Sequence, residues 1–329
     1  MINFSKNIIG HQNIIDKLLY KFENNTLHNS LIFFGQNGIG KTTLAFNFIS
    51  KILKIIDYNN YNNHIGLLYK NSHPNLRYIT RSYDETKDKT SEYISIDQIR
   101  GLNNFINQSS FNNIPKFIIF DSADNFNKNS SNSLLKILEE PSNNTYFILI
   151  SHQLSNILPT IRSRCIKFYF KNPSKDIFHE IIKNDNIDMN NKDIDFLYLL
   201  SNGSPGTAIK ISSDKMNDLY DSIIDLTNYN KDDFSKKIYD LSEYVSSFSN
   251  DEYKVFLMLL RFILINIIKN NLGILSEFTT FNNESVITKL ISFEILDFID
   301  NNEKDLFIYN LDKKIFCLNI FIPLKKSYE

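Results

Sequence analysis

The chain has 329 residues, of which 42% are hydrophobic and 22% are charged, and its formal net charge is -1. These proportions are ordinary for a soluble globular protein, and the length allows two or three domains with cores of their own. The near-zero net charge argues against a protein that binds nucleic acid through bulk charge, so any DNA contact has to be local or shared with partners.

Cysteine and histidine usage argues against a metal or disulfide framework. The only cysteines are Cys165 and Cys317, and the six histidines show no ligand spacing. The start of the chain lacks the apolar run of a signal peptide. The most apolar segment, residues 255–268, is interrupted by Arg261 and Asn266 and is too short to span a bilayer. We therefore expect a cytoplasmic protein with no membrane partner.

Residues 35–42 fit the pattern G-x-x-x-x-G-K-[ST] of a phosphate-binding loop, or P-loop. An apolar strand over residues 30–34 precedes the loop, and apolar residues at helical spacing follow to about Ile56. In such a loop, glycines let backbone N–H groups face a phosphate, the lysine reaches the outer phosphates, and the hydroxyl can bind Mg²⁺. A tight strand-to-helix turn without a ligand is the alternative. The predicted nucleotide-binding residues here are Gly35, Asn37, Gly38, Gly40, Lys41, Thr42 and Thr43.

Residues 116–121 form an apolar strand that ends in Asp121, which is typical of the Walker B motif. Its aspartate holds Mg²⁺ directly or through water. Hydrolysing sites of this kind usually place a glutamate next, but here the next residue is Ser122, whose hydroxyl is a poor general base. Asp124 is expected to point elsewhere. We predict a site that binds ATP or ADP, with Mg²⁺ held by Thr42 and Asp121, and whose ATPase activity is weak or absent.

A predicted helix ends before Pro141, and a predicted strand follows over residues 146–151. Two arginines lie close together in the sequence after this strand. Arg162 and Arg164 are two of only six arginines in a chain that otherwise favours lysine. A planar, always-charged guanidinium suits a phosphate held at a subunit boundary, and Arg164 is the stronger candidate for that role. A surface ion pair fits Arg162 better than Arg164.

The motifs NSLLKILEEP at residues 132–141 and TIRSRC at residues 160–165 resemble the clamp-loader branch of the AAA+ ATPases. More narrowly, they resemble the delta-prime family of bacterial DNA polymerase III subunits. Supporting matches lie at residues 9–12, 27–30, 72–75 and 203–206, so that the resemblance covers about the first 212 residues. It implies a pentameric machine that opens the sliding clamp and places it on primed DNA. Arg164 would be the catalytic arginine finger in trans, and the partners would be the motor (gamma/tau-like) and delta subunits, the clamp and, through the complex, primed DNA.

Two departures from the family pattern refine this expectation. Many relatives carry a four-cysteine zinc module between the P-loop and Walker B, but residues 57–115 contain no cysteine, so we predict no zinc. Motor subunits carry an arginine in the box that matches residues 203–208, and none is present here. Together with Ser122, this favours a non-motor, delta-prime-like subunit. A hydrolysing motor subunit of the same machine and a stand-alone P-loop kinase are the alternatives.

The predicted architecture has three parts. Residues 1–169 alternate strands and helices, as in an α/β P-loop domain of the AAA+ type with a parallel sheet flanked by helices. Residues 170–212 are predicted to form a small helical lid. Residues 213–329 are predicted to be all-helical, and the resemblance implies that they form a collar through which subunits oligomerise.

Overall fold

The structure is a computed structural model, and it describes residues 8–84, 89–91, 93–142, 144–185, 191–212, 214–227, 234–274 and 289–323. The chain divides into two compact units. One unit consists of Met1–Tyr198 with Gly203–Thr207, and the other of Leu199–Asn202 with Ala208–Glu329.

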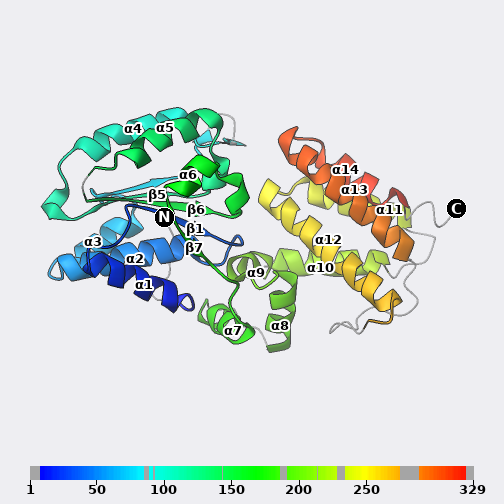
Figure 1. Cartoon of the computed structure of the whole chain (residues 1–329). Coiled ribbons are helices and arrows are strands. Elements are labelled where there is room, and N and C mark those ends of the chain that lie inside the picture. The colour runs from blue at the N-terminus through cyan, green and yellow to red at the C-terminus, as the bar shows by residue number, and fades with distance from the viewer. Residues whose placement is uncertain are drawn as a thin grey trace. The chain divides into compact units, whose positions relative to one another are not determined.

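The first unit is built on a five-stranded parallel sheet with the order β2-β5-β6-β1-β7 (Figure 1). Its strands are β1 (Ser30–Phe34), β2 (Leu76–Ile79), β5 (Lys116–Phe120), β6 (Thr145–Ser151) and β7 (Ile166–Tyr169). In the register of β1, Phe34 pairs with Ser151 of β6 and with Tyr169 of β7. Because the strands are parallel, their carboxyl ends meet at one edge of the sheet, where functional loops gather in such folds. The predicted α/β fold with a parallel sheet is confirmed.

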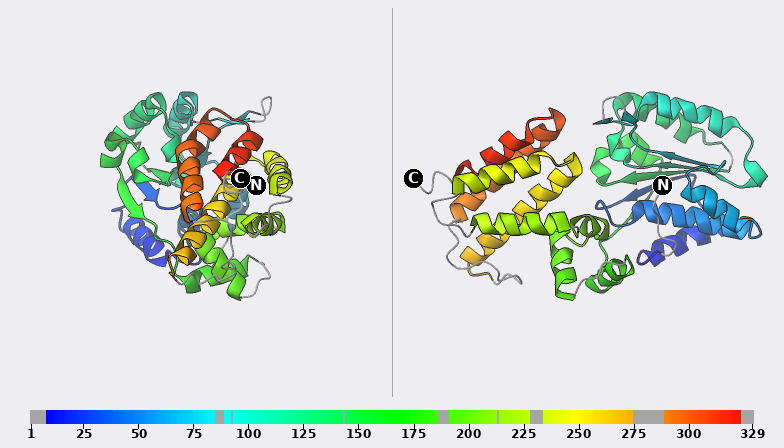
Figure 2. Two further views of the ribbon diagram at one scale, coloured as in Figure 1. Left: turned by 90° about the vertical axis from the view of Figure 1, so that its right-hand side faces the viewer. Right: turned by 180° about the vertical axis from the view of Figure 1, so that it is seen from behind.

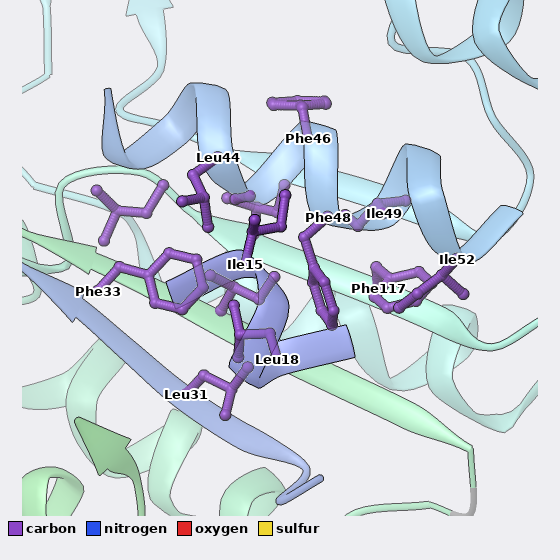
Figure 3. Packing of buried hydrophobic residues seen from close by; sticks show 14 of the residues in the cluster. Ile15, Leu18, Leu31, Phe33, Leu44, Phe46, Phe48, Ile49, Ile52 and Phe117 are labelled. Carbon is purple, nitrogen blue, oxygen red and sulfur yellow. The ribbon is translucent and has the colours of Figure 1, made fainter. Parts of the chain in front are cut away.

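Successive residues of each strand face opposite helix layers, as the period-2 geometry of a strand requires. Leu31 and Phe33 are buried with one group of helices, while Ile32 between them is buried with the other. The first group is α1 (Gln12–Glu23), α2 (Lys41–Ile56) and α3 (Tyr61–Tyr69), and the second is α4 (Ile96–Asn107), α5 (Lys128–Glu139) and α6 (Pro159–Ser163). Figure 3 shows Leu44 and Phe48 of α2 packed over the sheet. The two groups cover opposite faces of the sheet (Figure 2).

Local sequence signals set the helix boundaries on the second face. Ser95 and Gln98 make both hydrogen bonds of a capping box at the start of α4. The Asn127 side chain caps α5, which begins at Lys128 and ends at Glu139, before Pro141 as predicted. Between α3 and α4, β2 is followed by a small antiparallel hairpin of β3 (Tyr83–Asp84) and β4 (Lys89–Thr90).

The rest of the chain is helical in every segment that the structure describes. After β7 come α7 (Lys175–Asn184), α8 (Asn191–Leu200), α9 (Pro205–Ile211), α10 (Asp214–Thr227), α11 (Phe234–Ser246), α12 (Asn250–Asn271), α13 (Lys289–Ile308) and α14 (Lys313–Ile320). Within the second unit, Arg261 of α12 pairs with Asp300 (2.7 Å) and Glu303 (2.6 Å) of α13. The helices of the described segments are all too short or too polar to cross a membrane.

Candidate nucleotide-binding site

The P-loop leaves β1 at the carboxyl edge of the sheet and leads directly into α2. Its three glycines have positive φ, and a Cβ at Gly35 would collide with the carbonyl oxygen of Phe170. Among the described residues, the backbone N–H groups of Gly38, Gly40 and Thr42 have no hydrogen-bond acceptor. These groups lie at the N-terminus of a long helix, where a phosphate is stabilised by N–H donors and by the helix dipole. The loop therefore has the conformation and the free donors that a phosphate requires.

The buried Lys41 side chain lies across this loop. Its Nζ donates to the carbonyl oxygens of Gly35 (2.7 Å) and Gln36 (2.6 Å). Burial lowers the pKa of Lys41 to about 8, and the nearby carboxylates Asp121 and Asp124 oppose this shift. The Nδ1 atom of His152, at the end of β6, lies 3.4 Å from Lys41 Nζ, and burial together with the charge of Lys41 lowers the pKa of His152. A bound phosphate would supply the negative charge that favours the ammonium form of Lys41.

The residues predicted to hold Mg²⁺ lie next to each other. Thr42 Oγ1 donates to Asp121 Oδ2 at 3.3 Å, and the hydroxyl of Tyr78, on β2, donates to the same carboxylate oxygen. Both interactions hold the carboxylate beside the first turn of α2. A carboxylate and a hydroxyl beside a phosphate site are ligands that Mg²⁺ prefers, so Thr42 and Asp121 fit the predicted metal. No motif in the sequence points to Tyr78 or His152, because neither lies at a fixed spacing from the residue that it contacts.

Asp124, the next carboxylate in the sequence after Asp121, does not take the place of the missing glutamate. Ser122 has a left-handed backbone conformation, and the turn that follows directs Asp124 toward the end of β6. There Asp124 accepts hydrogen bonds from Ser151 Oγ (2.8 Å), His152 N (2.6 Å) and Gln153 N (3.2 Å). As predicted, Asp124 points elsewhere, and its oxygens are already hydrogen-bonded.

Other segments of the same unit hold the P-loop by its carbonyl oxygens. The Ser204 hydroxyl donates to Asn37 O at 2.7 Å, and Gly206 N donates to Gly38 O at 2.8 Å. On the other side, the imidazole Nε2 of His11 lies 3.0 Å from Ile39 O. These contacts use the acceptors of the loop and leave its N–H donors available. The boxes at residues 9–12 and 203–206, which are far apart in sequence, thus meet at the loop.

Arg164 lies just before β7, outside this cluster, and its side chain is 37% exposed. Its guanidinium donates to Glu139 Oε1 (2.7 Å) and to Thr160 O (2.9 Å). The expectation that a surface ion pair suits Arg162 better than Arg164 is wrong, since Arg164 makes the ion pair and Arg162 makes none with the residues that the structure describes. The α5 helix ends beside Arg164, and this proximity could not be read from the sequence.

No metal cluster accompanies the site in the described part of the chain, where no group of three or more His, Cys, Asp or Glu side chains is placed to hold an ion. Cys165 and Cys317 are buried and unpaired. His64 and His73, nine residues apart, do meet, but through a hydrogen bond of 3.0 Å between their rings.

The parallel sheet, the P-loop and the Thr42–Asp121 pair together define a P-loop α/β protein with the features of a nucleotide-binding domain. Residues 10–174, half of the chain, match the family described as "DNA polymerase III, delta subunit". The chain belongs to this family, and so to the clamp-loader proteins.

Individual relatives agree with this assignment. The chain is 36% identical over 124 residues to the DNA polymerase III subunit delta' of Pseudomonas aeruginosa, which covers 38% of each protein. It is 30% identical over 186 residues to the same subunit of Buchnera aphidicola subsp. Baizongia pistaciae, covering 55% of each. With the DNA polymerase III subunit gamma of Buchnera aphidicola subsp. Schizaphis graminum it shares 31% identity over 221 residues, 63% of this chain and 56% of that protein. The matched regions therefore span 38% to 56% of the length of these relatives.

Proposed function

We propose that this chain is a non-motor, delta-prime-like subunit of a replicative clamp loader. It would act with motor (gamma/tau-like) and delta subunits to load the sliding clamp onto primed DNA. It would bind ATP or ADP with Mg²⁺ at its own P-loop without efficient hydrolysis, and it would lend Arg164 to the ATP site of a neighbouring motor subunit.

The observation that carries the proposal is the missing general base beside an otherwise well-formed phosphate site. Ser122 follows Asp121, and Asp124 is hydrogen-bonded to the end of β6. A site of this kind can bind a nucleotide through the P-loop donors, Lys41 and Thr42, but it lacks a carboxylate to activate water. Arg164 supports the second part of the proposal, because its guanidinium is partly exposed and bears the permanent charge that a phosphate at a subunit boundary requires.

The motor subunit is the second candidate function, and the 31% identity to a DNA polymerase III subunit gamma favours it. The two functions differ in what Lys41 does. In a motor subunit, Lys41→Ala abolishes ATP turnover at that subunit's own site. In a non-motor subunit, the same change leaves most of the complex's turnover in place. A stand-alone kinase would instead yield a phosphorylated small molecule from the isolated chain.

The test compares three variants in complexes assembled with the motor and delta subunits. Arg164→Ala is expected to depress DNA-stimulated ATPase activity, because the receiving site loses a finger that is worth about 10³–10⁵ in rate in related phosphoryl transfers. Lys41→Ala is expected to matter much less. Arg162→Ala is the matched control, since it removes a neighbouring arginine that has no ion pair among the described residues.

Assembly of each complex is checked by size-exclusion chromatography, so that a lost subunit is not mistaken for lost catalysis. Equal and negligible effects of Arg164→Ala and Lys41→Ala would refute the finger assignment. A larger loss with Lys41→Ala than with Arg164→Ala would identify a motor subunit instead.

A further inference from the structure

A cavity of about 240 Å³ opens at the carboxyl edge of the sheet, where β2 and β5 end. Its walls are Thr80 and Arg81, which follow β2, and Asp121 and Ser122, which follow β5. Adjacent pairing of these two strands explains why the four residues meet, since Ile79 and Phe120 are register partners. The cavity is therefore a product of the sheet order.

Asp121 connects this cavity to the P-loop. One of its carboxylate oxygens accepts the hydrogen bond from Thr42, in the first turn of α2, while the residue itself forms part of the cavity wall. A polyphosphate bound to the loop at Thr42 therefore has space to extend into the cavity. A diphosphate needs less of this space than a triphosphate, whose terminal phosphate is the group farthest from the nucleoside.

Arg81 is a positively charged residue of the cavity wall and lies outside both the P-loop and Walker B motifs. Its charge is close enough to His152 to contribute to the lowering of that histidine's pKa, and His152 in turn contacts Lys41. Arg81 makes no ion pair with the residues that the structure describes, whereas Arg164 and Arg261 are paired with carboxylates. Its guanidinium is thus available to a ligand of the cavity, and its planar donors match the oxygens of a phosphate.

We propose that Arg81 binds the terminal phosphate of a nucleoside triphosphate held on the P-loop of the same chain, and so makes this site prefer triphosphate to diphosphate. The inference rests on the proposed nucleotide binding. It adds to Lys41 and Thr42 of the P-loop a further residue, outside that motif, whose contact depends on the number of phosphates.

The experiment is isothermal titration calorimetry of the purified full chain with ATP and with ADP, each in the presence of Mg²⁺. Arg81→Ala is expected to weaken ATP binding about tenfold to a hundredfold, the range for a hydrogen bond to a charged group, and to leave ADP binding within about twofold. Arg81→Lys keeps the positive charge but loses the planar guanidinium, so its ATP affinity is expected to lie between those of the wild type and Arg81→Ala. Arg100→Ala, which removes an exposed arginine of α4, is the matched control and should change neither affinity.

Thermal unfolding of each variant checks that the fold is retained, which the exposed position of Arg81 favours. An equal loss of ATP and ADP affinity, or no loss of either, would overturn the assignment of Arg81. A wild-type chain that binds neither nucleotide at millimolar concentration would overturn the proposed nucleotide binding itself, and with it this inference. A selective loss of ATP affinity supports both.

Discussion

At the scale of single residues, the candidate site combines a loop in the P-loop conformation with a predicted Walker B segment, in which Ser122 follows Asp121 in place of the expected glutamate. The left-handed Ser122 begins a tight turn, and this turn is what directs Asp124 to the backbone N–H of His152. Asp124 thereby connects the turn after β5 to the end of β6. Gly206 also has a structural role, because its backbone N–H donates to Gly38 O where α9 approaches the P-loop.

Gly206→Ala is expected to destabilise the protein and to weaken nucleotide binding. An added Cβ would lie 2.9 Å from the oxygen and 3.0 Å from the Cα of Gly38, and both are backbone atoms that cannot rotate away. Overpacking of this kind costs about 1–3 kcal/mol. The measurements are the midpoint of thermal unfolding by calorimetry and the affinity for ADP.

Gly101→Ala is the control for Gly206→Ala. Gly101 lies inside α4, and a Cβ there meets nothing within 4 Å. Alanine is favoured over glycine in a helix by roughly 0.5–1 kcal/mol, so this variant should be slightly more stable than the wild type. If Gly206→Ala were as stable as Gly101→Ala, the contact between α9 and the P-loop would not be the close one described.

At the scale of elements, α3 and the segment before β2 are joined by a buried chain of hydrogen bonds. The backbone N–H of Asn75 donates to His73 Nδ1 at 3.2 Å, so that His73 Nε2 carries the proton and donates to His64 Nδ1. His64 Nε2 then donates to Asp57 Oδ2 at 3.1 Å. Both rings are buried in this arrangement.

Acid is expected to weaken this part of the fold. Burial, with a smaller contribution from His64, lowers the pKa of His73 to about 4, from an ordinary value of 6.5. Because the unfolded chain takes up this proton first, the stabilisation is complete above pH 6.5 and is lost as the pH falls toward 4. The loss is of the order of 2–3 kcal/mol. Urea unfolding at pH 7 and pH 5 measures it, and His73→Gln should flatten the dependence.

His28→Gln is the matched control, because His28 lies outside this chain of hydrogen bonds and should leave the pH dependence unchanged. We also expect the purified protein to contain no stoichiometric zinc and to keep its unfolding midpoint in chelator. An unfolding midpoint that falls on treatment with chelator would contradict the absence of a structural metal. A pH dependence that survives in His73→Gln would contradict the role of the histidine pair.

At the scale of the whole molecule, the segment Gly203–Thr207 belongs to the same compact unit as the P-loop, while the later helices form the other unit. The interactions of the candidate site that involve Ser204 and Gly206 are therefore internal to the first unit. The proposed nucleotide binding and the assembly expected of the predicted collar would therefore reside in separate parts of the chain.

A fragment of residues 1–212, which keeps α9 whole, is expected to fold and to bind ADP within about threefold of the full chain. It should fail to assemble with motor and delta subunits, because the predicted collar is missing. Calorimetric titration and size-exclusion chromatography measure the two properties, with the full chain as reference. A folded fragment that still assembles would show that the collar is not required.

Much of the first unit was predictable, because local rules decide it. Buried strands are recognisable in the sequence as short apolar runs. The P-loop needs glycine where φ is positive. The capping box of Ser95 and Gln98 depends on two residues that are three positions apart. The sheet edge then brings Thr42 and Asp121 together, as the two motifs implied. These features depend on neighbours in sequence or on a pattern that many chains share.

The sequence by itself therefore determined the fold class, the P-loop motif and the presence of Ser122, and not a glutamate, directly after Asp121. Only the tertiary structure decided that Tyr78 holds Asp121, that His152 contacts Lys41, and that His64 meets His73. The order β2-β5-β6-β1-β7 places residues that are far apart in the chain at one sheet edge, and no local pattern records which side chains then touch. For the same reason, the proposed role of Arg81 can be recognised only in the folded molecule, because the cavity that it lines forms where β2 and β5 pair.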